Sequence, residues 1–329
     1  MRLLCAPLQG YTDRCFRLAH SATIGGIADY TTPFVRLEQE RLRPRDLHDL
    51  QGLSPDQRRL TTPQALARTP HDIRLIASQL ADLGFDRLDL NLGCPFPKVV
   101  QQGYGAALPN EPDALPDLLL AAVACVPPHA LSLKLRLPDT PHLLDRLADL
   151  CRPLPLRHIT LHPRTAAQQY GGSPDHAAFA RFRQLLGPQT TLVYNGDVTA
   201  PDSPFPNCDA LMLGRGLLAN PLLPRLLLGE TFSDDQFRQL LRDFHRRLVD
   251  LLQEQPQPLP RLKTLWDYFL PYERNRHRRH LLKATTLPDY LDATAELLEH
   301  AQLPSPHPQY PHMTFALGNE GRRGRTPSP

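Results

Sequence analysis

Short apolar runs recur along the first two thirds of the chain, and each run ends in polar, glycine or proline residues. These runs predict eight β-strands: Leu3–Pro7, Ala28–Val35, Thr62–Ala67, Arg87–Asn91, Leu131–Arg136, His158–His162, Thr191–Asn195 and Ala210–Leu213. Amphipathic stretches such as His71–Leu83 lie between the strands and predict helices. Strands that alternate with helices indicate repeated βα units, so we predict an α/β fold, a TIM (β/α)8 barrel. A doubly wound sheet would need fewer strands and an early Gly-rich turn.

The strand pattern stops at about residue 233. Asp234–Gln253 is amphipathic throughout and has acidic residues at its start, which suit the helix dipole. Further helix-like stretches follow, at Arg261–Leu270, Glu273–Ala284 and Pro288–Glu299. We therefore predict a barrel domain over residues 1–233 and a small helical domain over residues 234–303. Residues 304–329 are rich in Pro, Gly, Ser and Arg, a composition that predicts a disordered tail.

The composition is that of an ordinary globular protein, with 41% hydrophobic and 22% charged residues. No apolar run approaches the roughly 20 residues of a membrane span, and the first residues turn polar too soon for a secretory signal. We therefore expect a cytoplasmic monomer without membrane contact. Six scattered cysteines without a C-x-x-C pair argue against a zinc site or a disulfide framework. A net charge of +3 is too small to indicate a nucleic-acid partner by itself.

Polar and glycine residues gather at the predicted carboxyl ends of the strands, where TIM-barrel enzymes place their active sites. Gly196 and Gly214 would let backbone N–H groups approach an anion, and Arg215 would add a charge-assisted contact to a phosphate. The alternative is a pair of tight turns that require glycine. Lys134 ends an apolar strand, where a cation suits the electron-rich edge of a flavin. An internal salt bridge is the alternative for Lys134.

Six blocks in this order resemble the tRNA-dihydrouridine synthase family, and the resemblance covers roughly residues 2–300. The blocks are Ala6–Asp13, Asp89–Pro95 with Gly103–Leu108, Ser132–Arg136, His162–Thr165, Asn195–Asp197 and Gly214–Gly216. Within the family, Thr32–Arg36 and the stretch from Arg261 are similar to the bacterial C-type branch. The resemblance implies reduction of a uridine in the tRNA D-loop, at position 16, to 5,6-dihydrouridine. It also implies FMN as cofactor and NADPH as electron donor. No Rossmann fingerprint is present, so NADPH would bind transiently over the flavin.

The resemblance also implies residue roles. Cys94 would be the catalytic proton donor, since an ordinary thiol has a pKa of about 8.5 and is mostly protonated at neutral pH. The cofactor-binding residues would be Pro7, Leu8, Gln9, Gln64, Lys134, His162, Asn195, Gly196, Asp197, Gly214 and Arg215. Asn91 and Arg136 would face the uridine or the edge of the flavin ring.

Charge patterning supports a tRNA partner. Residues 261–283 hold seven Lys or Arg against two acids, with aromatic residues such as Trp266 interleaved. This mixture suits contact with phosphates and stacking on unpaired bases. We assign tRNA binding to Arg36, Arg261, Lys263, Arg274, Arg276, Arg278 and Arg279. A merely solvated basic helix is the alternative.

Two other functions fit parts of the pattern. An FMN barrel that resembles dihydroorotate dehydrogenase would act on a free pyrimidine, but it would have no use for the basic helical segment. A catalytically silent tRNA-binding protein would not need Cys94 and Lys134, which are both present.

Overall fold

The computed structural model describes residues 1–111, 113–273 and 276–302. Within these residues, nine strands form one parallel sheet in the order β5-β2-β1-β11-β10-β9-β8-β7-β6. Their bounds are β1 Arg2–Cys5, β2 Asp29–Thr31, β5 Thr61–Thr62, β6 Gln64–Ala65, β7 Leu88–Leu92, β8 Leu131–Arg136, β9 Leu156–His162, β10 Leu192–Tyr194 and β11 Ala210–Leu213. The short strands β3 (Leu37–Glu38) and β4 (Arg41–Leu42) form a separate antiparallel hairpin.

The two ends of the sheet meet because β5 and β6 are halves of one interrupted strand. Pro63 stands between them and has no N–H to donate to a sheet. Thr32 N–H still donates to the Thr62 carbonyl at 3.0 Å, and Asp89 N–H donates to the Pro63 carbonyl at 2.9 Å. The interrupted strand therefore joins β2 to β7 and closes an eight-membered barrel. The predicted TIM barrel is confirmed, although its third strand is two short pieces.

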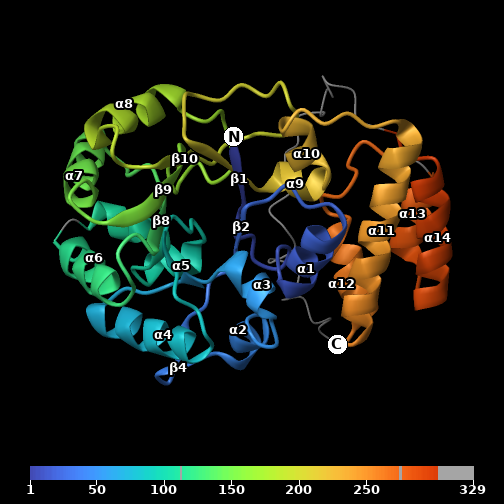
Figure 1. Ribbon diagram of the computed structural model, residues 1–329, viewed down its shortest axis with the longest axis horizontal. Coiled ribbons are helices and arrows are strands. Elements are labelled where there is room, and N and C mark those ends of the chain that lie inside the picture. The colour runs from blue at the N-terminus through green and yellow to red at the C-terminus, as the bar shows by residue number, and fades with distance from the viewer. Residues whose placement is uncertain (112, 274–275, 303–329) are drawn as a thin grey trace, which may run out of the picture.

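Helices surround the barrel and follow its strands (Figure 1). Their bounds are α1 Arg14–Thr23, α2 Pro44–His48, α3 Pro55–Arg59, α4 Pro70–Asp82, α5 Pro97–Gln101, η1 Gly105–Asn110 (a 3₁₀ helix), α6 Leu115–Ala124, α7 Pro141–Cys151, α8 His176–Leu186, α9 Arg215–Ala219 and α10 Leu223–Leu227. Helix α4 begins in a capping box, in which Thr69 and Asp72 each accept the other's backbone N–H. No helix among the described residues is both long and apolar enough to cross a membrane.

The remaining helices form a group on one side of the barrel, next to α1 (Figure 1). They are α11 Asp234–Gln253, α12 Pro258–Leu265, α13 Arg276–Lys283 and α14 Leu287–Glu299. Phe244 of α11 packs edge-on against Phe16 of α1, with ring centroids 5.7 Å apart. Leu270 N–H donates to the Ala219 carbonyl at 3.0 Å. Buried apolar residues of the barrel and of these helices form one continuous cluster.

The predictions for the carboxyl-terminal third have different outcomes. Trp266 is 1% exposed and donates through Nε1 to the Tyr290 hydroxyl at 2.8 Å. Its predicted role in stacking on bases is therefore wrong, because its ring packs in the helical core. The domain boundary near residue 233 stays a prediction, and the tail over residues 304–329 lies outside the described residues.

Candidate active site

Cys94 lies just beyond β7, in a turn whose backbone is fixed by contacts with three residues. The Asn91 carboxamide oxygen accepts the N–H groups of Gly93 at 3.1 Å and of Cys94 at 2.9 Å. Arg136 donates through Nε to the Gly93 carbonyl at 3.1 Å. Gly105 packs so closely that a Cβ there would lie 2.9 Å from the Cys94 Cβ, and its φ of +59° also favours glycine. The turn therefore fixes the Cys94 backbone, and the residue is 7% exposed.

A chain of buried polar side chains supports this turn from inside the barrel. Asn91 Nδ2 donates to Gln64 Oε1 at 2.7 Å, and Gln64 Nε2 donates to Asp89 Oδ2 at 2.7 Å. Ser132 donates to the other oxygen of Asp89 at 2.6 Å. Burial raises the pKa of Asp89 to about 6, although the bonds from Ser132 and Gln64 favour its charged form. Gln64 and Asn91, which we expect at the cofactor and the substrate, therefore meet at the barrel mouth.

Lys134 of β8 lies beside Asn91 of β7 in the parallel register, within electrostatic reach of Asp89 and Cys94. Burial lowers the pKa of Lys134 to about 8, helped by the nearby charge of Arg136 and opposed by Asp89. The ammonium therefore keeps its proton at neutral pH. The internal salt bridge that we considered for Lys134 is not formed with any carboxylate in the described part of the chain.

The far side of the mouth holds a cluster of cations around one carboxylate. Arg164, which is fully buried, and Arg215 both donate to Asp197 Oδ1, at 3.1 and 2.6 Å. Arg164 also donates to His162 Nε2 at 3.2 Å. Burial, together with Arg136 and other cations nearby, holds the pKa of His162 well below its usual value, so the imidazole is neutral. A cluster of guanidinium groups at the mouth of a barrel suits a bound anion.

Two residues of this cluster, Arg164 and Tyr170, have no role predicted from the sequence. Arg164 stands in the His162-Pro-Arg motif, and that motif was the signal that could have identified it. Tyr170 lies in the loop after β9, and the guanidinium carbons of Arg136 and Arg215 lie 5.3 and 4.5 Å from its ring centroid. An irregular loop has no periodicity from which such a contact could be predicted.

The glycines at the mouth differ in whether a side chain would fit at their positions. A Cβ at Gly216 would lie 2.1 Å from the Val198 carbonyl, and a Cβ at Gly196 would overlap the Tyr194 ring. Close packing therefore requires a glycine at both positions, whereas the tight turns that we considered do not, since neither residue has a positive φ. A Cβ at Gly214 would meet only ordinary contacts, at 3.6 Å from Ala6 and 3.8 Å from Leu8. Local packing therefore does not require a glycine at position 214.

The other residues predicted for the cofactor surround this mouth. Pro7, Leu8 and Gln9 follow β1, and Leu8 N–H donates to Thr12 Oγ1 at 2.8 Å. The Gln9 carboxamide oxygen is buried and accepts no hydrogen bond from the described residues. Asn195 donates to the Met212 carbonyl at 2.8 Å and so ties the loop after β10 to β11.

The cations predicted to bind tRNA differ in their exposure and in their partners. Arg36, Arg276 and Arg279 are exposed. Arg278 instead lies over the Trp266 ring and donates to the Phe269 carbonyl at 2.8 Å.

Of the other three predicted cations, two have partners within the protein. Arg261 forms an ion pair with Asp13, and Lys263 donates to the Ala284 carbonyl. Arg274 lies outside the described residues. Our sequence reasoning did not separate cations that hold the chain together from those that face solvent.

Comparisons with known proteins identify the family of the chain. The profile of the dihydrouridine synthase (Dus) family matches residues 4–242. The tRNA-dihydrouridine(16) synthase of Shigella flexneri is 30% identical over 243 residues, which cover 69% of this chain and 75% of that protein. The tRNA-dihydrouridine synthase B of Klebsiella pneumoniae is 27% identical over 236 residues, covering 68% and 70%.

A solved structure has the same barrel fold. A variant of morphinone reductase in complex with tetrahydroNAD superposes with a TM-score of 0.50 at 13% identity, and the superposition covers 72% of this chain and 90% of that one. This likeness concerns the fold alone. The match of the family profile spans more than half of the sequence, and the chain therefore belongs to the dihydrouridine synthase family.

Proposed function

We propose that this chain reduces a uridine of tRNA to 5,6-dihydrouridine, with FMN as its cofactor, NADPH as the electron donor and position 16 as the target. The observation that carries the proposal is the fixed turn of Cys94 at the barrel mouth, held by Asn91, Arg136 and Gly105. A thiol in a fixed place beside an amide network can deliver a proton to one carbon of a bound base.

The residues at the mouth fit a flavin mononucleotide. Gln9 offers a buried oxygen that accepts no hydrogen bond from the described residues, which suits an N–H of the flavin ring. Lys134 offers an ammonium to an electron-rich ring edge. Arg164 and Arg215 place two guanidinium groups beside Asp197, and guanidinium groups suit a phosphate. When bound, FMN would supply the hydride for uracil C6.

The protein's own part in the reaction follows from these contacts. Cys94 would hold the proton that is delivered to C5. The hydrogen bonds of Asn91 to the Gly93 and Cys94 amides would keep the sulfur in one place through the reaction. Lys134 and Arg136 make the mouth positive, which favours the negative charge that develops on a reduced ring.

The substrate assignment has separate support. The family profile, the tRNA-named relatives and the exposed Arg276 and Arg279 favour RNA over a free pyrimidine. Position 16 rests on the similarity to the Shigella flexneri tRNA-dihydrouridine(16) synthase.

Two measurements test the proposal. Heat-denatured protein should release FMN, identified by chromatography against FAD. The flavin-loaded protein should then form dihydrouridine in unmodified tRNA, faster with NADPH than with NADH, at one position mapped by sequencing. Release of FAD, or no dihydrouridine in tRNA alongside turnover of a free pyrimidine, would overturn it.

A further inference from the structure

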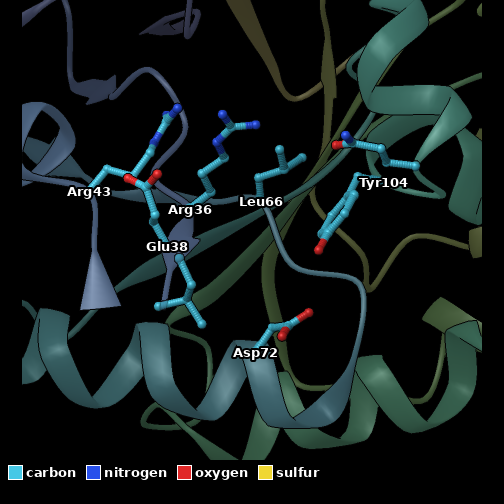
Figure 2. Close-up of a pocket in the computed structure, with 8 residues that line it drawn as sticks. Arg36, Glu38, Arg43, Leu66, Asp72 and Tyr104 are labelled. Atoms are coloured by element: carbon cyan, nitrogen blue, oxygen red, sulfur yellow. The ribbon is translucent and has the colours of Figure 1, made fainter. Parts of the chain in front are cut away.

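A pocket of about 180 Å³ opens beside the Cys94 turn, outside the set of residues predicted for the flavin. The hairpin of β3 and β4, the end of β6, the start of α4 and the loop after α5 contribute to its wall. Figure 2 shows Arg36 and Tyr104 on opposite sides of Leu66, with the Asp72 carboxylate on the helix below.

The pocket adjoins the reaction site directly. Leu66 and Tyr104, which line it, also pack in the small apolar cluster that contains Cys94. A uridine held at Cys94 would therefore place a nearby nucleotide of the same RNA within reach of this pocket.

The side chains of the pocket offer both donors and acceptors. The Arg36 guanidinium has no hydrogen bond or ion pair to any described residue, whereas Arg43 is neutralised by Asp46 at 2.8 Å. Asp72 uses Oδ2 to accept the N–H groups of Arg68 and Thr69, at 3.2 and 3.1 Å. Its Oδ1 accepts none in the described part of the chain, and Figure 2 shows the carboxylate directed into the pocket.

The carboxylates argue against a phosphate as the occupant. Glu38 and Asp72 both line the pocket, and two negative charges would repel another anion. The aromatic ring of Tyr104, by contrast, is a surface on which an unpaired base can stack.

We propose that this pocket binds an unpaired guanine of the same tRNA while the uridine lies at Cys94. The inference rests on the proposed function. Guanine carries N1–H and N2–H donors that suit a carboxylate, and O6 and N7 acceptors that suit an arginine. Asp72 would receive the first edge, Arg36 would donate to the second, and Tyr104 would stack on the ring. Adenine lacks the donors for Asp72, and cytosine lacks the acceptor pair for Arg36.

The test replaces single unpaired guanines of a tRNA substrate by inosine, which lacks only the N2 amino group. With the wild-type protein, inosine at one position should lower kcat/KM for dihydrouridine formation about tenfold, the effect of removing a hydrogen bond to a charged group. In Asp72→Asn the same replacement should change kcat/KM less than about twofold, because the amide has one oxygen and the helix cap already uses it. Flavin content and NADPH oxidation without tRNA should stay at the wild-type level and show that the variant is folded.

Arg36→Ala has a matched control in Arg41→Ala, which removes an exposed arginine from the same hairpin outside the pocket. Only Arg36→Ala should lower kcat/KM strongly. The inference is overturned if no inosine position distinguishes wild type from Asp72→Asn, or if Arg41→Ala is as harmful as Arg36→Ala. Failure of the proposed function has a different signature, since no tRNA would then gain dihydrouridine, whatever its guanines.

Discussion

The barrel mouth and the carboxyl-terminal helices both carry clusters of positive charge, but the two clusters differ in their surroundings. At the mouth, Arg164 is fully buried and shares Asp197 with Arg215. On α13, Arg276 and Arg279 are exposed. The comparison shows that the number of cations in a segment does not identify a binding surface, because burial and existing partners decide what each cation can still bind.

The two clusters should also respond differently to mutation. A buried charge has given up its water and depends on its partners, so removing one member leaves the others uncompensated. An exposed charge interacts through water and salt, and its contributions are small and nearly additive. The free-energy changes of substitutions at the mouth should therefore be non-additive, whereas those of substitutions at the exposed cations of α13 should add.

The largest expected effect at the mouth is that of Cys94→Ala. Loss of the proton donor should lower the rate of dihydrouridine formation by about 100-fold or more. FMN content and oxidation of NADPH should not change, because the side chain is needed only for the proton delivered to uracil. Single-turnover measurements with tRNA check this, and a near-normal rate would remove Cys94 from the reaction.

Arg164→Ala should break the cation cluster. The free energy of unfolding should fall by about 3 kcal/mol, because the Gly171 and Gly172 carbonyls and His162 lose a charged donor whose side chain is fully buried, while Asp197 keeps Arg215. Urea denaturation measures this change. The matched variant Arg279→Ala, on the exposed helix, should cost less than about 0.5 kcal/mol. Equal losses for the two variants would contradict the contrast between the clusters.

The fold was largely predictable because strands and strand ends follow from local patterns. The bounds of β8 and β11 match the predicted ranges residue for residue. The run Thr62–Ala67 predicts one continuous strand, whereas the structure divides it at Pro63, because proline has no N–H to donate to a sheet.

The site was predictable only where it coincides with strand ends. Lys134 and Asn91 lie at the mouth as expected. Tyr170 reaches it through an irregular loop, where the direction of a side chain depends on tertiary packing that no local pattern encodes. Trp266 faces the core together with Leu262, Leu265 and Phe269, which lie at helical spacing from it, and the basic residues of the same segment concealed this apolar pattern. The roles of these residues toward flavin and tRNA stay predictions.

The buried carboxyl group of Asp89 should make the free energy of unfolding depend on pH. The pKa of Asp89 is raised to about 6 in the folded protein from an ordinary value of 3.8, so the folded state holds its proton more tightly. Its contribution to stability is therefore complete below about pH 4 and is lost as pH rises through 6. Between these values the free energy of unfolding of the wild type should fall by up to about 3 kcal/mol relative to Asp89→Asn, which cannot titrate. Urea denaturation at several pH values checks the difference, and a flat difference would rule out this titration.

The smallest expected effects concern the exposed cations of α13. Replacing Arg276 and Arg279 by Gln should lower the log–log slope of tRNA affinity against salt by about 0.7 to 0.9 for each phosphate that an arginine no longer neutralises. Arg278→Gln should leave the slope unchanged, since this guanidinium is already bonded to the Phe269 and Leu270 carbonyls. It should instead lower the free energy of unfolding by about 1 to 2 kcal/mol, because the Trp266, Phe269 and Leu270 carbonyls lose their charged donor. Binding titrations over a range of salt concentrations, together with urea denaturation of the same variants, separate the two kinds of cation. Two outcomes would contradict this prediction: a lower slope for Arg278→Gln, or an unchanged slope for the Arg276 and Arg279 replacements. Either would mean that exposure does not decide which arginines of α13 contact the RNA. The barrel rim around Arg36 would then be the surface to test for RNA binding.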